Sequence, residues 1–188
     1  SLVAYSSDAR VILSRRKMDD SGKAQAKVAI AGLSPNASTN IWGGISCAFD
    51  QLPLGGTIFL LTDGQPNIRP PRGELYELQK KLDGRNDIVL NTYGFGYHLD
   101  SKLLFDLARN TQGSYGYIPD IGQVGTTFVH AMANLRTSIR KKSTLKIETS
   151  GKLSPMPELA KFDWGYQLPL GQLTMGQPRS IHLVCDAP

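Results

Sequence analysis

The chain of 188 residues has few cysteines and no long apolar run, and each shortage excludes a class of protein. Cys47 and Cys185 lie far apart in the sequence, so they form neither a disulfide framework nor a metal-binding pair. Their apolar neighbours predict buried thiols, which favours an intracellular protein. No apolar run approaches the ~20 residues that a membrane-spanning helix needs, so we expect no membrane span.

Motifs of common catalytic and phosphate-binding sites are also missing. Gly43-Gly44 and Gly94-x-Gly96 lack the GxGxxG or Walker spacing that binds phosphate between a strand and a helix. Ser46, Ser101 and Ser114 lack the Gly-x-Ser-x-Gly setting of a hydrolase nucleophile, and the histidines lack the spacing of zinc ligands. We therefore expect no catalysis by this chain.

The composition is that of a globular protein, with 40% apolar residues, 20% charged residues and a net charge of +5. This length suits one domain, with or without a small appendage. Basic residues cluster at 10–17 and at 136–146. We interpret the second cluster as the exposed end of a helix, where cations complement the helix dipole, and we expect no nucleic-acid partner.

Local patterns predict the elements along the chain. Two β-rich runs, 1–6 and 9–14, are joined by Ser7-Asp8 and predict a hairpin. A polar loop is expected over 35–40. Apolar residues at helical spacing predict helices over 22–33, 41–52, 73–82, 101–111 and 125–141. Strands are predicted over 57–61, 87–94 and 113–118.

Helix caps and the fold class follow from the same patterns. Ser38 or Thr39 is expected to cap the helix at 41–52, and Asp100 or Ser101 the helix at 101–111. Strands and helices alternate from residue 57 to residue 141, which indicates an α/β three-layer sandwich with a mostly parallel central sheet.

After Lys142 the helical pattern ends. Strand-like runs at 144–149, 166–170 and 180–185 are separated by Gly and Pro. This change predicts a main domain over 1–142 and a partial β appendage over 143–188.

The segment 57–67 is the most informative part of the sequence. Its continuous apolar run, Ile58–Leu61, has Gly55-Gly56 before it and Pro66 after it, which predicts a strand buried on both faces. Ligands bind beyond the carboxyl ends of such strands, and Asp63 lies at that end. The alternative is that Asp63 only caps a turn, because Asp-Gly is a common turn pair.

Four polar or aromatic residues are expected on the same rim as Asp63. Gln65 and Asn67 follow it directly, and Tyr97 and His98 follow the next predicted strand. They are candidates for contacting a ligand. The alternative is that they are ordinary loop residues.

Several motifs, in order, resemble those of von Willebrand factor type A (VWA) domains. They are Ser-Thr39-Asn-Ile-Trp-Gly-Gly, Phe-Leu-Leu-Thr-Asp63-Gly, and Tyr-Gly-Phe-Gly with a following Leu-x-x-Leu-Ala-Arg-x-Thr-x-Gly-Ser-Tyr-Gly-Tyr-Ile. The resemblance covers residues 1–141. Residues 170–179 resemble the β extension that follows the domain in some eukaryotic multidomain proteins.

The resemblance implies a metal-ion-dependent adhesion site (MIDAS) that holds Mg²⁺ or Mn²⁺ and leaves an open position for a carboxylate of a partner protein. It places a threonine ligand on Thr39 and an aspartate ligand on Asp63. Hydroxyl and carboxylate oxygens are the ligands that such hard cations prefer. The expected function is protein–protein interaction. The alternative is a metal-independent scaffolding domain whose partner binds elsewhere, for example on the appendage.

The family's first loop, Asp-x-Ser-x-Ser, supplies three further site residues and is absent from this sequence. In the family it ends a strand that lies between the strands matched here by 1–6 and 57–62. Without that strand the sheet would have a gap of about 10 Å. We therefore expect a segment of the same protein upstream of Ser1 to complete both the sheet and the site.

Overall fold

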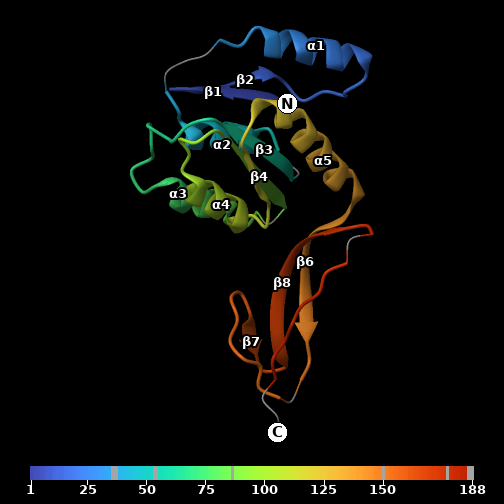
Figure 1. Cartoon of the computed structure of the whole chain (residues 1–188). Coiled ribbons are helices and arrows are strands. Elements are labelled where there is room, and N and C mark those ends of the chain that lie inside the picture. Colours follow the sequence, from blue (N-terminus) through green and yellow to red (C-terminus); the bar gives the residue numbers. More distant parts are fainter. Residues whose placement is uncertain (35–37, 53–54, 86, 150, 177, 186–188) are drawn as a thin grey trace. The chain divides into compact units, whose positions relative to one another are not determined.

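The structure is a computed structural model that describes residues 1–34, 38–52, 55–85, 87–149, 151–176 and 178–185. The chain divides into two compact units, Ser1–Val124 and Gly125–Pro188, and most of their elements are labelled in Figure 1. The expected boundary after residue 142 falls inside the second unit and stays a prediction. Of the polar loop expected over 35–40, residues 35–37 lie outside the described residues.

The first unit contains two sheets among its described residues. Strands β1 (Leu2–Tyr5) and β2 (Ala9–Leu13) form the expected antiparallel hairpin. Strands β3 (Gly56–Thr62), β4 (Ile88–Phe95) and β5 (Tyr115–Ile118) form a parallel sheet in the order β3-β4-β5. This parallel sheet, with helices around it, confirms the expected α/β class.

The helices of this unit begin close to where the sequence placed them. They are α1 (Asp20–Ala31), α2 (Ile41–Asp50), α3 (Glu74–Leu82) and α4 (Ser101–Asn110), while the short 3₁₀ helix η1 (Ile121–Gln123) was not predicted. Helix α2 packs against β1, β2 and β3, while α4 packs against β4, β5 and α3.

Two caps show how these helices start. Asp100, one of the two expected residues, caps α4 by accepting the backbone N–H of Leu103 at 3.0 Å. The expectation for α2 is wrong, because Asn40 and not Ser38 or Thr39 accepts the backbone N–H of Gly43, at 2.7 Å. Asn40 directly precedes the first helical residue and can therefore reach the unpaired N–H groups of the first turn.

Buried apolar side chains from α2, α3, α4, β3 and β4 form one core. Its members are Ile41, Ile45, Phe49, Ile58, Leu60, Leu78, Ile88, Leu90, Leu103, Leu104 and Leu107. Strand β4 is buried on both faces along nearly its whole length. Strand β3 differs from the prediction, because Phe59 and Leu61, on the face opposite Ile58 and Leu60, are only half-buried.

The second unit combines a helix with an antiparallel sheet. Helix α5 (Val124–Thr137) leads into β6 (Ser138–Ile147), which pairs with β8 (Gly165–Thr174). The short strand β7 (Ala160–Phe162) pairs with the other edge of β8, and the sequence did not predict it. The described helices of the chain are all too short or too polar to cross a membrane.

Three further sequence predictions are wrong, and two of them concern only this second unit. The helix expected to reach Lys141 ends at Thr137, because residues from Ser138 onward pair with β8, so most of the second basic cluster lies on a strand. The strand expected at 180–185 is a single bridge between Leu153 and Cys185. Cys185 is exposed and Cys47 half-buried, so the expectation of two buried thiols fails.

Candidate functional site

Strand β3 ends in a tight turn that presents Asp63 to solvent. The buried Thr62 hydroxyl donates to the carbonyl oxygen of Gly64 at 3.1 Å and accepts the Gly64 N–H at 3.4 Å. Such a hydroxyl-to-backbone ring stabilises a turn locally. Asp63 is therefore held at the carboxyl end of β3, with its side chain exposed.

Thr39 lies beside this turn. Its Oγ1 atom is 3.6 Å from the position that a Cβ atom would occupy at Gly64. Thr39 and Asp63 also line the same cavity. The fold thus brings together a hydroxyl and a carboxylate that are 24 residues apart in the sequence.

Hydrogen bonds fix the Thr39 loop on two sides. On one side, the Thr39 N–H donates to Oδ1 of Asn67 at 2.8 Å, and the Asn67 N–H donates to the Thr39 carbonyl oxygen at 3.1 Å. On the other side, the Asn40 backbone and side-chain N–H groups donate to the carbonyl oxygens of Ser6 and Ser7, at 2.8 and 3.0 Å. The loop is therefore tied both to the turn after β3 and to the β1–β2 hairpin.

The cavity that Thr39 and Asp63 line has a volume of about 940 Å³ and lies between β1 and β3. We call it the β1–β3 cavity. Tyr5 of β1 reaches to β3, where its hydroxyl donates to the carbonyl oxygen of Leu61 at 2.6 Å. Burial raises the pKa of Tyr5 to about 12, a hydrogen bond with Thr62 opposes this shift, and the negative charge of Asp63 adds to it. The Asp63 carboxylate is therefore close enough to Tyr5 to influence the ionisation of its hydroxyl.

The four predicted rim residues lie on two loops. Gln65 and Asn67 are on the loop between β3 and α3, and both are exposed. Tyr97 and His98 are on the loop between β4 and α4, where 87% of the Tyr97 surface is exposed. The Asn67 side chain contacts a predicted metal ligand, because its Oδ1 atom accepts the Thr39 N–H.

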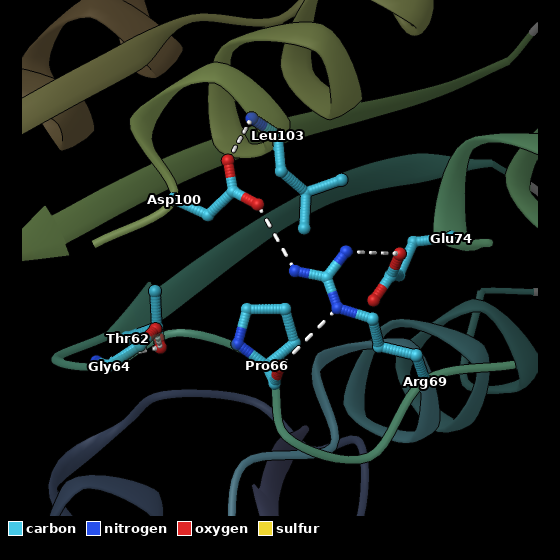
Figure 2. Close-up of polar contacts among 7 residues, drawn as sticks. All are labelled: Thr62, Gly64, Pro66, Arg69, Glu74, Asp100 and Leu103. Atoms are coloured by element: carbon cyan, nitrogen blue, oxygen red, sulfur yellow. Dashed lines mark hydrogen bonds and ion pairs between the residues drawn. The ribbon is translucent and has the colours of Figure 1, made fainter. Parts of the chain in front are cut away.

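Arg69 connects these two loops through three contacts, as Figure 2 shows. Its guanidinium lies 3.1 Å from Oδ2 of Asp100, which opens α4, and 3.6 Å from Oε2 of Glu74, which opens α3. Its Nε also donates to the carbonyl oxygen of Pro66 at 3.4 Å. Glu74 is only 2% exposed, so Arg69 supplies a counter-charge to a buried carboxylate.

Sequence reasoning missed Arg69, Glu74 and the linking role of Asn67. The sequence contained a signal for such an ion pair. Arg69 lies in a loop with three prolines, and the helix that follows this loop begins with the acid Glu74. The partners of Arg69 are nevertheless 5 and 31 residues away. Only the folded chain identifies them.

Thr39 and Asp63 fit part of a site for a hard divalent cation. A hydroxyl and a carboxylate are suitable oxygen donors for Mg²⁺ or Mn²⁺, which take about six ligands including water. Within the described residues no group of three or more His, Cys, Asp or Glu side chains is arranged to hold a metal. The remaining positions would be filled by water or by oxygen atoms of other residues.

Comparison with solved structures identifies the fold. The structure titled "von Willebrand factor type A from Catenulispora acidiphila" matches 92% of this chain, at 20% identity and a TM-score of 0.68. The chain has a VWA-like fold. It spans 45% of that matched protein, so the VWA-like region is less than half of the neighbour's length.

Two further structures share the VWA-like fold. The ArnB paralog VWA2 from Sulfolobus acidocaldarius matches 89% of this chain and 41% of its own, at 16% identity and a TM-score of 0.52. Proximal thread matrix protein 1 from the mussel byssus, in a structure with a zinc-occupied MIDAS motif, matches 69% of this chain and 33% of its own. Its identity is 19% and its TM-score 0.50.

Sequence comparison adds one relative. The uncharacterized protein YfbK of Escherichia coli is 25% identical over 154 residues, which are 78% of this chain and 26% of YfbK. No protein-family model matches the chain. The zinc in the mussel protein is a property of that protein.

Proposed function

We propose that this chain is a protein-interaction domain that binds a carboxylate of a partner through Mg²⁺ or Mn²⁺ held in part by Thr39 and Asp63. The observation that carries the proposal is the meeting of these two oxygen donors beside one cavity at the carboxyl end of β3. When bound, the cation supplies a positive charge with an open position for the partner's carboxylate.

The charge of the site supports the need for a cation. Asp63 is an acidic residue with an exposed side chain. A partner carboxylate approaching the Asp63 side chain alone would meet like-charge repulsion, whereas a divalent cation between the two carboxylates would attract both. Partner binding is therefore expected to depend on the cation.

The β1–β3 cavity bears on how the site is completed. β1 and β3 belong to separate sheets in the described part of the chain, and the cavity lies between them. A further strand could pair there with both edges and bring additional oxygen ligands toward Asp63. That a segment upstream of Ser1 supplies this strand stays a prediction.

A calorimetric Mn²⁺ titration tests the proposal. The wild-type chain is compared with Thr39→Ala, Asp63→Ala and Asp83→Ala, where Asp83 is an exposed acid at the end of α3. We expect saturable binding that is lost with Asp63→Ala, weakened with Thr39→Ala and unchanged with the Asp83 control. If the natural protein extends upstream of Ser1, a longer version should bind more tightly.

Two results would contradict the proposal. One is the absence of saturable binding in both the present chain and a longer version. The other is equal binding by wild type and Asp63→Ala, because the cation would then lie elsewhere.

The scaffolding alternative has its own observation in the second unit. The Phe162 and Trp164 rings stack with centroids 5.3 Å apart, and both side chains are more than 40% exposed. Exposed aromatic side chains are common at protein interfaces. If Trp164→Ala abolishes partner binding while Asp63→Ala leaves it intact, the partner binds the second unit and the scaffolding function is favoured.

A further inference from the structure

The turn after β3 does more than carry Asp63, because its later residues tie the site to its surroundings. We propose that Asn67 is a positioning residue: it clamps the Thr39 loop against the turn that carries Asp63, while Arg69 anchors the same segment to α3 and α4. This inference rests on the proposed function for its consequence, the cation affinity. The clamp itself is a property of the fold.

The bonds between Asn67 and Thr39 form a closed ring. The Asn67 side chain accepts the Thr39 N–H at 2.8 Å, and its backbone N–H donates to the Thr39 carbonyl oxygen at 3.1 Å. The Ile68 N–H donates to the same carbonyl oxygen at 3.5 Å. The backbone N–H and carbonyl groups of Thr39 are thus both bonded to residues 67–68. The position of this segment therefore determines where the Thr39 hydroxyl lies.

The side-chain bond is the part of this ring that depends on residue type. Any residue at position 67 other than proline retains a backbone N–H for the Thr39 carbonyl. Only a residue with an acceptor at the Oδ1 position can also receive the Thr39 N–H. Asparagine therefore contributes one specific contact, and its removal would loosen Thr39 without changing either metal ligand.

Arg69 gives the clamp a fixed base. It joins the Pro66 carbonyl, Glu74 and Asp100 (Figure 2), so the segment that contains Asn67 is bonded to the starts of two packed helices. The segment 67–69 is bonded to Thr39 at one end and to the starts of α3 and α4 at the other. The packing of these two helices therefore helps to fix the position of Thr39. Thr39 and Asp63 can then keep a set separation before any cation binds, which reduces the entropy lost on binding.

Amide hydrogen exchange by NMR tests the clamp without a metal. The Thr39 exchange rate is measured relative to that of the Leu90 amide, which is buried, bonds to Oγ1 of Thr111 and reports global opening. Asn67→Ala should raise this ratio by about tenfold, because one hydrogen bond is lost. Asn67→Asp keeps the acceptor and should restore the ratio. The matched control Ile68→Ala keeps the backbone bond to Thr39 and should leave it unchanged.

A Mn²⁺ titration of the same variants tests the consequence. Asn67→Ala should weaken binding about tenfold, while Ile68→Ala binds as wild type does and Asp63→Ala does not bind. An unchanged Thr39 ratio in Asn67→Ala would overturn the clamp. A raised ratio with unchanged affinity would overturn the positioning role.

The two proposals can fail separately. Absence of Mn²⁺ binding by both the wild-type chain and a longer version would overturn the proposed function, and the Thr39 amide would still decide the clamp. If Asn67→Ala unfolds the chain, the Leu90 amide exchanges as fast as the Thr39 amide, and Asn67→Asp alone then decides. Asn67→Asp supports the clamp by retaining the wild-type ratio and overturns it by raising the ratio.

Discussion

The two units of the chain are stabilised in different ways. In Ser1–Val124, helices α2, α3 and α4 enclose side chains of β3 and β4 in a continuous apolar core. In Gly125–Pro188, α5 has no buried residue, and the buried apolar side chains described are Leu153, Tyr166 and Leu168. The first unit therefore relies on side-chain packing, while the second relies more on the backbone pairing of β6, β7 and β8.

This difference explains where a precise site can be built. Ligands must be held close to a productive geometry by side chains that packing and hydrogen bonds lock in place. The Thr39–Asp63 pair lies on the packed unit, and the exposed aromatic pair lies on the other. Each unit also contains one of the two tryptophans, Trp42 or Trp164, so fluorescence can follow each unit separately.

The largest effect is expected from the core of the first unit. Phe49 is fully buried, and Phe49→Ala should lower the free energy of unfolding by about 3–5 kcal/mol, through lost transfer free energy and a cavity. Urea unfolding of a Trp164→Phe background, followed through Trp42, measures the change. Leu168→Ala, followed through Trp164, should cost less. A larger cost for Leu168→Ala would contradict the comparison.

The next effect is electrostatic and also belongs to the first unit. Arg69→Met would leave the Glu74 carboxylate buried without the counter-charge described here, at a cost of about 3 kcal/mol. Urea unfolding followed through Trp42 measures it. Adding Glu74→Gln removes the buried charge and should recover much of this stability. If the double variant is as unstable as Arg69→Met, the ion pair is not the cause.

A pH effect should also separate the units. The pKa of Tyr5 is raised to about 12 in the fold, above the unfolded value near 10. Its contribution to stability is therefore fully present below pH 10 and is lost as the pH rises toward 12, by about 2–3 kcal/mol. Urea titrations followed through Trp42 should show this loss. Tyr5→Phe should reduce it and leave the part that comes from Tyr93, whose pKa is also raised by burial; an unchanged slope in that variant would contradict the assignment.

The smallest effect is expected on the surface of the second unit. Trp164 stacks on Phe162, and Lys146 lies 5.4 Å from the Trp164 ring centroid. Because these groups are exposed, Trp164→Ala should cost about 0.5–1.5 kcal/mol. Far-UV circular dichroism during thermal unfolding measures the change, with Lys146→Met as a milder comparison. A cost above that of Phe49→Ala would mean that the aromatic pair is a core.

Much of the first unit could be predicted from local sequence. The hairpin at 1–14, the β3 and β4 strands and the Asp100 cap depend on residues close together in the chain, so periodicity and turn chemistry reveal them. The position of Asp63 at the carboxyl end of β3 is of the same kind. The resemblance of the sequence to VWA motifs also predicted the fold that the solved structures share.

Distant pairing decided what local sequence could not. The helix predicted over 125–141 includes residues 138–141, yet Ser138 and Arg140 pair with residues of β8 more than 30 positions later. The free energy gained by pairing with β8 outweighs the small intrinsic preference of this segment for a helix. Residues 180–185 have a strand-like composition, but in the described chain only Cys185 forms a bridge.

The sequence by itself determined which chemical groups the candidate site can use. Thr39, Asp63 and Asn67 supply these groups, and the turns that carry them depend on residues close in the sequence. Tertiary structure alone decided how these groups meet. Asn67 receives the Thr39 N–H across 28 residues, and Arg69 reaches Asp100 across 31. Such contacts depend on where packed elements place their ends, and that placement follows from burial of the shared core.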